Sequence, residues 1–426
     1  MARRINVDST IHEAFLSASA AARLLGVRKE TLYAYVSRGL LVSHGEARSK
    51  GSRYATSEVE RLRARSEARA GHAAVAAGAL RWGEPVLDSA ITAIGPNGPI
   101  YRGYAAVDLA ARGTSFERCA ELLWTGVLPA ESPRWESPRR RSKLAAGRSA
   151  GRAVALPTAS LGALERFPTL WKTMASAALA DDARVHGTEV DDWARARKLL
   201  MALASLGRES DAPTFAGRLA AGLGLRATPA VHGALDLMLV LVADHELNAS
   251  SFAARVAAST GADLYSALVA ALATAAGPEH GAAADRVYAL AEAIGDPRNA
   301  PRVALERLSR GEPVFGFDHP LYPGGDPRAP PLLALERARA APNGPSDSAR
   351  VLRALVAHMK ARKHHPNVDL ALVLACESIG APSGSASLIF VLGRTAGWVA
   401  HALEQRKAGF VLRPRARYVG VPPVTD

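Results

Sequence analysis

A loop rich in glycine and proline, Gly311–Arg328, carries the residues of this sequence best suited to chemistry. Within it, His319 lies nine positions before Arg328. Glycine lets a backbone approach a ligand closely and proline fixes the loop shape, so such a segment presents side chains with little freedom. A histidine can donate a hydrogen bond to an oxygen, and the planar fork of arginine matches a carboxylate. Taken alone, the loop composition favours a surface segment whose histidine and arginine are merely solvated.

Two further histidines border predicted helices. His245 follows the apolar helix predicted for 230–243, where buried polar groups need partners, although a helix cap would also explain it. His280 precedes the small residues Ala282–Ala284 that open another predicted helix. A helix N-terminus lowers the pKa of a histidine and keeps it a neutral hydrogen-bond donor, which suits the polarisation of a carbonyl group. A turn histidine without a chemical task is the alternative.

Asp369 opens a helix predicted for 369–378 that is apolar on all sides, so we expect this helix to be buried. Burial raises the pKa of a carboxyl group and makes it a usable base, although helix capping would also place an aspartate here. Arg394 lies within another apolar helix, and Arg413 and Arg415 lie near the C-terminus. A buried arginine needs a partner, either an anionic ligand or a salt bridge within the protein. Together these residues could hold a polycarboxylate, polarise its carbonyl groups and remove a proton from carbon.

The composition predicts a mainly α protein. Of the 426 residues, 48% are hydrophobic but only 6% are aromatic, and alanine is abundant. The two cysteines lie far apart in sequence, which argues against a disulfide framework and for a reducing, cytoplasmic location. The N-terminus has no apolar signal core, and the apolar runs are too short to span a bilayer. We therefore expect a soluble protein without a membrane partner. The net charge of +13 allows nucleic acid, an anionic surface or an anionic small substrate as partner.

The first 75 residues carry 13 Lys and Arg against 7 Asp and Glu. Two short helices are predicted at 18–25 and 29–38, followed by a hairpin or wing at 41–54 and a charged helix at 56–69. This order resembles the winged helix-turn-helix of MerR and excisionase proteins, whose second helix can enter a major groove. The alternative is a helical adaptor that binds no DNA. The candidate phosphate contacts are Arg28, Lys29, Arg38, Arg48, Lys50 and Arg53.

The rest of the chain is predicted to be helical after one hairpin. Residues 68–78 form a plausible linker, and Pro85–Gly103 has β-branched residues around Pro-Asn-Gly, a hairpin signal. From Ala105 onward helical spacing dominates, as in Phe116–Trp124. The arginine-rich stretch Pro133–Arg152 is predicted to be a surface excursion.

Several ordered motifs between Gly83 and Gly420 resemble the citrate synthase family. They are YRGYAAVDLAARGTSFERCAELLWTG, ADHELNASSF, GPEHGAAADRV, the loop 311–328, PNVD, GRTAGWVAHALEQ and RPRARYVG. The resemblance implies a mainly α, two-domain helical fold that works as a homodimer. A large domain would comprise 76–280 and 385–426, a small domain 281–384 would close over the substrates, and the helix-turn-helix domain 1–75 would precede both.

The resemblance also implies roles. Asp369 matches the base that takes a proton from the acetyl-CoA methyl group, His280 the donor to the enol oxygen, and His319 the residue that polarises the oxaloacetate ketone. The matching oxaloacetate ligands are His245, Arg328 and Arg394, with Arg413 supplied by the neighbouring subunit. The CoA thioester is a substrate, and neither a cofactor nor a metal is implied. Propionyl-CoA, as in 2-methylcitrate synthase, is the alternative acyl donor. A regulator that senses metabolites, binds DNA and has lost turnover is the alternative from another class.

Two residues depart from the family pattern. Asp318 precedes His319 where the family generally has glycine, and Glu279 precedes His280 where a neutral residue is usual. A carboxylate close to either imidazole would raise the pKa of that histidine and oppose the anionic CoA phosphates. We therefore expect both residues to affect catalytic efficiency and CoA affinity more than the type of reaction.

Overall fold

The computed structural model describes residues 15–37, 40–45, 52–56, 58–59, 62, 87–136, 163–338, 344–414 and 420–421. The chain divides into two compact units, Met1–Asp88 with Pro414–Asp426, and Ser89–Arg413. We refer to the described part of residues 15–62 as the N-terminal unit and to Ser89–Arg413 as the body. The polar and charged stretch Pro133–Arg152 and the charged helix predicted for 56–69 lie largely outside the described residues.

The N-terminal unit consists of two short helices and a three-stranded antiparallel sheet of order β1-β3-β2. Ser17 accepts a hydrogen bond from the N–H of Ala20 and so caps the first helix, and Gly26 adopts φ +65° in the turn between the helices. Leu32 and Tyr54 are fully buried in the small core. The predicted hairpin is present as β2 and β3, while β1 was not predicted. The elements are β1 (Phe15–Ser17), α1 (Ala18–Leu24), α2 (Lys29–Ser37), β2 (His44–Gly45) and β3 (Ser52–Ala55).

The body opens with the predicted Pro-Asn-Gly hairpin. Strands β4 (Thr92–Gly95) and β5 (Gly98–Tyr101) pair antiparallel, and β6 (Tyr104–Ala105) extends the sheet. Tyr101 is fully buried, and its hydroxyl accepts the N–H of Asp244 at 3.3 Å. The hairpin therefore anchors the loop that carries His245.

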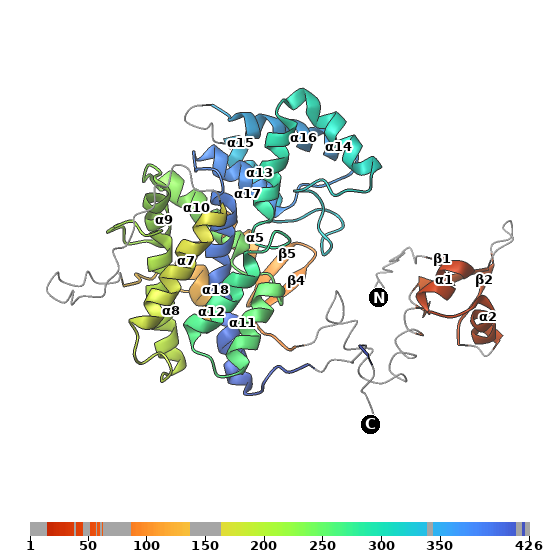
Figure 1. Ribbon diagram of the computed structural model, residues 1–426, viewed down its shortest axis with the longest axis horizontal. Helices are drawn as coiled ribbons and strands as arrows, with labels where there is room; N and C mark the ends of the chain where they lie inside the picture. The colour runs from red at the N-terminus through yellow and green to blue at the C-terminus, as the bar shows by residue number, and fades with distance from the viewer. Residues whose placement is uncertain are drawn as a thin grey trace, which may run out of the picture. The chain divides into compact units, whose positions relative to one another are not determined.

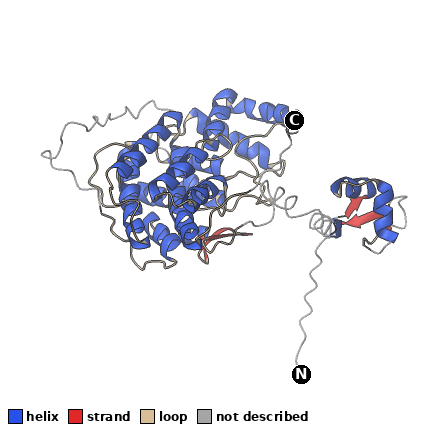
Figure 2. Ribbon diagram, turned by 60° about the horizontal axis from the view of Figure 1, so that its bottom comes forward, coloured by secondary structure: helices blue, strands red, loops and turns tan. Residues whose placement is uncertain are grey.

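Helices make up almost all of the rest of the body. In Figure 1, α13 to α17 gather at one end, and α18 runs through the helices of the other part. Figure 2 shows how little strand the described chain contains. The helices are α5 (Ala106–Ala111), α6 (Phe116–Thr125), α7 (Ala163–Leu179), α8 (Glu189–Ala204), α9 (Phe215–Leu223), α10 (Pro229–Val242), α11 (Ala249–Ser259), α12 (Leu264–Ala275), α13 (Ala283–Ile294), the 3₁₀ helix η2 (Pro297–Asn299), α14 (Ala300–Ser309), α15 (Ala329–Ala338), α16 (Asp347–Lys360), α17 (Val368–Ser378) and α18 (Ser385–Ala408).

Helix α18 is the central core helix. Its 24 residues are long and apolar enough to cross a membrane, but the apolar window is 100% buried inside the protein. Two glycines let it lie very close to the end of α10. A Cβ at Gly393 would lie 2.9 Å from the carbonyl oxygen of Leu239, and one at Gly397 would overlap the carboxylate of Asp244. This close approach places Arg394, between the two glycines, beside the loop that carries His245.

The loop 311–328 is packed against α17, so it is not a solvated surface segment. Phe317 forms an antiparallel bridge with Pro366, and the N–H of Asn367 donates to the carbonyl oxygen of Gly316 at 2.9 Å. Gly316 adopts φ +89°, and a Cβ there would lie 2.7 Å from Cβ of Leu370. A residue with a side chain would therefore meet both backbone strain and steric overlap.

We expect Gly316→Ala to destabilise the body by roughly 2 to 4 kcal/mol, the sum of left-handed strain and overpacking. Gly311→Ala is the matched control, because Gly311 also has a positive φ, +69°, but no atom lies within 4 Å of its Cβ position. This control should cost only about 1 kcal/mol. Denaturant unfolding of both variants measures the difference, and equal losses would contradict the packing argument.

Four residues of the predicted surface excursion, Pro133–Arg152, lie in the described part of the chain. Arg134 and Glu136 are exposed, as predicted, but Trp135 is only 5% exposed. Its ring stacks on Trp124 with centroids 5.5 Å apart, and its Nε1 donates to Glu121 at 2.9 Å. A large aromatic side chain favours burial even between exposed polar neighbours. Both cysteines are buried, and neither is in a disulfide.

Candidate active site

His245 lies in the loop between α10 and α11. Asn248 begins α11, and its Oδ1 accepts the N–H groups of Ser250 and Ser251, each at 3.1 Å. The ring of His245 is buried, and its Nε2 lies 2.8 Å from the hydroxyl of Tyr322 in the loop 311–328. Burial, and then the charges of Arg328 and Arg394, lower the pKa of His245 well below its usual value. His245 is therefore a neutral imidazole.

His319 lies next to His245, with ring centroids 5.4 Å apart. Its Nδ1 accepts the backbone N–H of Leu321 at 3.1 Å. Because a backbone N–H can only donate, the proton of the neutral ring is on Nε2, which is a hydrogen-bond donor. Burial, and then the charge of Arg328, lower the pKa of His319 to about 4. At neutral pH this histidine can donate to a substrate oxygen without carrying a charge.

His280 precedes α13, and its Nε2 lies 2.7 Å from the hydroxyl of Ser250. Trp398 donates to the same hydroxyl at 2.9 Å. The predicted lowering of the pKa is present, to about 4, but its causes are burial and then the charge of Arg394. Helix α13 begins at Ala283, among the small residues where the sequence predicts a helix start, and the effect of its N-terminus on this pKa stays a prediction.

Arg328 is 2% exposed and forms a two-pronged ion pair with Asp326, through Nε at 2.9 Å and Nη2 at 2.8 Å. The second oxygen of Asp326 also accepts the N–H of Val368, the first residue of α17. Burial opposes ionisation of Asp326, but the charge and hydrogen bonds of Arg328 outweigh it and lower the pKa of this carboxyl. Asp326 thus fixes Arg328 against the helix that carries Asp369.

Arg394 is 1% exposed, and its Nε donates to the carbonyl oxygen of Val242 at 2.9 Å. Its guanidinium lies over the ring of Phe390, 4.7 Å from the centroid. Among the described residues no carboxylate lies within ion-pair distance of it. Burial lowers the pKa of Arg394 to about 10. A buried cation without a carboxylate partner favours an anionic ligand.

Asp369 lies in the first turn of α17, and its N–H donates to Oδ1 of Asn367, the N-cap, at 3.1 Å. Asn367 therefore supplies the cap that Asp369 could have supplied. Burial raises the pKa of Asp369 to about 6, with Arg328 and Arg394 opposing the rise. Arg328 and Arg394 also lower the pKa of His245, but the convergence of the Asp369 carboxyl with the imidazoles stays a prediction.

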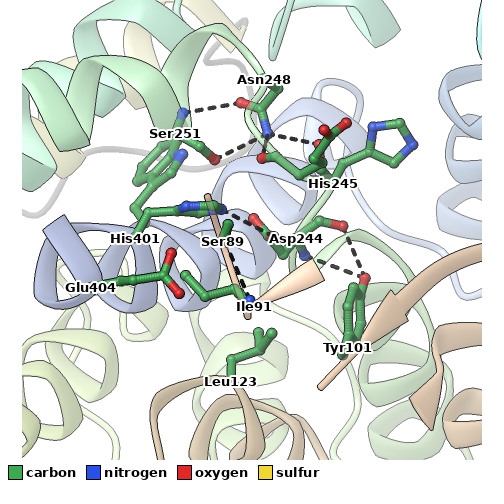
Figure 3. Close-up of polar contacts among 12 residues, drawn as sticks. Ser89, Ile91, Tyr101, Leu123, Asp244, His245, Asn248, Ser251, His401 and Glu404 are labelled. Atoms are coloured by element: carbon green, nitrogen blue, oxygen red, sulfur yellow. Dashed lines mark hydrogen bonds and ion pairs between the residues drawn. The ribbon is translucent and has the colours of Figure 1, made fainter. Parts of the chain in front are cut away.

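A network of charged and polar side chains contacts Asp244, the residue before His245 (Figure 3). Arg255 donates through Nε to Nδ1 of His401 at 3.0 Å, so the proton of His401 is on Nε2, which faces Asp244 Oδ2 at 3.2 Å. Arg255 also pairs with Glu404. Burial favours a neutral Asp244, but His401 and Arg394 outweigh this and lower the pKa of the carboxyl. The residue before His245 is thus held as a carboxylate by groups on two helices, α11 and α18.

The expected effects of Asp318 and Glu279 on the neighbouring histidines are wrong. The pKa values of His319 and His280 are both lowered, not raised. The carboxylate of Asp318 accepts a hydrogen bond from His364 Nδ1 at 2.6 Å, and Glu279 pairs with Arg286 at 2.5 Å. Each carboxylate therefore contacts a partner other than the imidazole that follows it.

The remaining predicted site residues lie outside this cluster. Arg413 is exposed at the end of the body, and in the N-terminal unit Arg28, Lys29 and Arg53 are exposed. Arg38, Arg48, Lys50 and Arg415 lie outside the described residues. In the described part of the chain, no group of three or more His, Cys, Asp or Glu side chains could hold a metal ion.

Sequence reasoning missed four residues of the site: Ser250, Tyr322, Asp326 and Phe390. Each lies within nine positions of a residue that was identified. Their signal in the sequence was proximity to a motif. Ser250 and Tyr322 hydrogen-bond to residues distant in sequence, which leaves no local pattern. Asp326 and Phe390 contact Arg328 and Arg394, two and four positions away.

The body is a mainly helical fold whose polar residues of interest include three imidazoles of lowered pKa, two buried arginines and the carboxyl of Asp369, whose pKa is raised. A family model described as "Citrate synthase, C-terminal domain" matches residues 79–415. The 2-methylcitrate synthase of Shewanella oneidensis is 32% identical over 368 residues, which cover 81% of this chain and 96% of that protein. The citrate synthase of Mycolicibacterium smegmatis is 32% identical over 359 residues, 80% and 94% of the two chains.

Solved structures agree with these relatives. The crystal structure of citrate synthase from Thermotoga maritima matches with a TM-score of 0.64 and 25% identity, covering 81% of this chain and 96% of that one. The chain belongs to the citrate synthase family. It is an enzyme that condenses an acyl-CoA with oxaloacetate.

Proposed function

We propose that the acyl donor is acetyl-CoA and that Asp369 removes a proton from its methyl carbon. The raised pKa of this carboxyl, at the N-terminus of a buried helix, is the observation that carries the proposal. A base works best when its pKa lies near the working pH, and about 6 is much closer to neutrality than an ordinary aspartate. His280 donates to the enol oxygen as the proton leaves, because its low pKa keeps it neutral.

Oxaloacetate is held, in this proposal, by His245, Arg328 and Arg394, and His319 polarises its ketone through Nε2–H. The enol carbon attacks the ketone carbon, a carbon–carbon bond forms, and the ketone oxygen takes up a proton to give citryl-CoA. Water then cleaves the thioester and releases citrate and CoA. The buried guanidinium groups of Arg328 and Arg394 support this assignment, because their hydrogen bonds within the protein orient them before the substrate arrives.

We further propose that 76–280 with 385–426 and 281–384 are domains that close over the substrates, and that the enzyme is a cytoplasmic homodimer. His245, His280 and Arg394 would then face His319, Arg328 and Asp369 across the closing cleft. Two exposed apolar side chains of α7, Trp171 at 38% and Leu179 at 79%, support a second copy as partner. The exposed Arg413 would enter the site of that copy. Sedimentation of the purified protein tests the dimer.

Release of the CoA thiol tests the function directly. Purified protein with oxaloacetate should release thiol from acetyl-CoA faster, in kcat/KM, than from propionyl-CoA. The reverse order would make the chain a 2-methylcitrate synthase, which its similarity to both kinds of relative also allows. If neither acyl-CoA releases thiol, the proposed condensing activity is contradicted.

The pKa values predict the acid side of the pH profile. Asp369 must be ionised to act as a base, so kcat/KM for acetyl-CoA should fall as pH drops through about 6. A second fall near pH 4 is expected where His280 and His319 become protonated. Initial rates between pH 4 and 8 measure both steps. A first midpoint below pH 5 would show that Asp369 is not the base.

A second candidate function, DNA binding, concerns the N-terminal unit. Two helices joined by a turn at Gly26, with Arg28 and Lys29 exposed at the start of α2, support the winged helix-turn-helix assignment. If this unit binds DNA, affinity of the full chain should fall steeply with salt, and Arg28→Ala with Lys29→Ala should reduce the salt slope by about 2. Binding without any turnover would favour a regulator. Normal turnover of a chain lacking residues 1–75 would show that the unit is dispensable for catalysis.

A further inference from the structure

Asp318, the residue that departs from the family's glycine, adopts φ +58°, in the left-handed region. Aspartate tolerates this region better than most residues with a side chain. Its carboxylate accepts two hydrogen bonds from the segment before α17, from His364 Nδ1 at 2.6 Å through Oδ2 and from the N–H of His365 at 3.0 Å through Oδ1. We call Asp318, His364 and His365 the clasp.

The clasp lies between two groups that the proposed mechanism uses. On one side, Asp318 is bonded directly to His319. On the other side, Asn367 donates through Nδ2 to the carbonyl oxygen of Asp318 at 3.3 Å, while its Oδ1 accepts the N–H of Asp369. His319, which polarises the ketone, and the base Asp369 are therefore linked through a few residues. The carboxylate of Asp318 adds a second link through His364 and His365.

We propose that Asp318 is a positioning residue, whose carboxylate fixes the distance between His319 and Asp369 by holding the loop 311–328 to the start of α17. This inference rests on the proposed function. The backbone supplies two further bonds: the N–H of Asn367 donates to the carbonyl oxygen of Gly316 at 2.9 Å, and the N–H of Asp318 donates to the carbonyl oxygen of His365 at 2.7 Å. Both bonds survive any substitution of Asp318 except proline, so substitutions of the side chain test the carboxylate alone.

Two substitutions separate the carboxylate from backbone strain. Glycine accepts φ +58° without strain but removes both side-chain contacts. Asparagine also tolerates this conformation, and it can keep both contacts, since Oδ1 accepts from His365 and Nδ2 donates to His364 Nδ1 in the tautomer whose proton is on Nε2. Asp318→Gly should therefore loosen the loop without adding backbone strain. Asp318→Asn should restore the wild-type behaviour.

The experiment is steady-state kinetics on the full chain with acetyl-CoA and oxaloacetate. Asp318→Gly is expected to lower kcat about tenfold and raise the KM for oxaloacetate about fivefold, because reacting groups displaced by a fraction of an ångström lose much of their rate advantage. The KM for acetyl-CoA should change less than twofold. Asp318→Asn should stay within about twofold of the wild type in every constant. His364→Ala should reproduce part of the loss, and adding it to Asp318→Gly should cost little more.

Glu312→Gln is the matched control, because it removes a carboxylate from the same loop that pairs only with Arg310 and Arg307. It should leave kcat and both KM values unchanged. Wild-type kinetics in Asp318→Gly, or independent effects of Asp318→Gly and His364→Ala, would overturn the proposal. If the wild type shows no turnover, the proposed function fails, and calorimetric titration of oxaloacetate into the wild type and Asp318→Gly decides the clasp. Equal affinities, or binding by neither protein, would then overturn it.

Discussion

Replacing Asp369 by alanine is expected to lower kcat at least about 10³-fold while the Kd for oxaloacetate changes less than about threefold. A positioned general base contributes roughly 10² to 10⁴ in rate, and abstraction of a proton from a thioester methyl group depends heavily on it. The oxaloacetate ligands do not include Asp369 in our assignment. Thiol release measures kcat, and calorimetric titration measures the Kd. Loss of oxaloacetate binding would show that Asp369 is a structural residue.

Glu377→Gln is the matched control for this variant, because it removes a carboxylate from the same helix at its far end. It should have wild-type kinetics.

The pH dependence of stability gives an independent test of Asp369, with a defined sign. The pKa of Asp369 is raised from 3.8 to about 6, so the folded state binds its proton more tightly than the unfolded state. The carboxylate therefore destabilises the fold fully above about pH 6, and the penalty disappears below pH 4. Asp369→Asn should stabilise the protein at pH 7.5 by on the order of 1 to 3 kcal/mol, and not at pH 4.

Replacing Arg394 by methionine is expected to raise the Kd for oxaloacetate by about 10² to 10³ without lowering the stability of the ligand-free protein. Loss of a buried charge that pairs with a ligand carboxylate costs roughly 2 to 5 kcal/mol in binding. In the free protein, burial lowers the pKa of Arg394 to about 10, so its charge is unfavourable there. Methionine has a similar length and no charge to desolvate. The thermal midpoint should stay within about 2 °C, and the upward shift produced by oxaloacetate should vanish.

Arg406→Met, three turns further along α18, is the control. Arg406 pairs with Asp192 and donates to the carbonyl oxygen of Ala262, so its loss should lower the thermal midpoint and leave oxaloacetate affinity unchanged. The two arginines of one helix are thus expected to give opposite results. A large drop in stability for Arg394→Met, with oxaloacetate binding retained, would contradict its assignment as a ligand.

The local elements of this protein are largely determined by its sequence. Helical spacing of apolar residues predicts α6 and α10 within a residue or two, because burial of one face is a local pattern. The β4–β5 hairpin follows from Pro-Asn-Gly, since few residues fit that turn. The positions of His245, His280, His319 and Asp369 on loops and at a helix start were also predicted correctly.

The protonation states were decided by the tertiary structure. Adjacency in sequence predicted that Asp318 and Glu279 would raise the pKa of the following histidines, and both predictions were wrong. The carboxylates of Asp318 and Glu279 contact His364 and Arg286. The pKa values of the following imidazoles are lowered by burial and by the charges of Arg328 and Arg394. Coulomb interaction depends on distance in space, which neighbours in sequence do not share.

The sequence by itself thus determined which elements form and which side chains have the right chemistry. Only the tertiary structure decided that Asp326 accepts the N–H of Val368, that Tyr322 meets His245, and that Arg394 keeps no carboxylate partner among the described residues. The physical reason is that helix and turn formation depend on neighbours a few positions away. Burial and charge pairing, which set the pKa values, depend on segments brought together from up to about 150 positions apart.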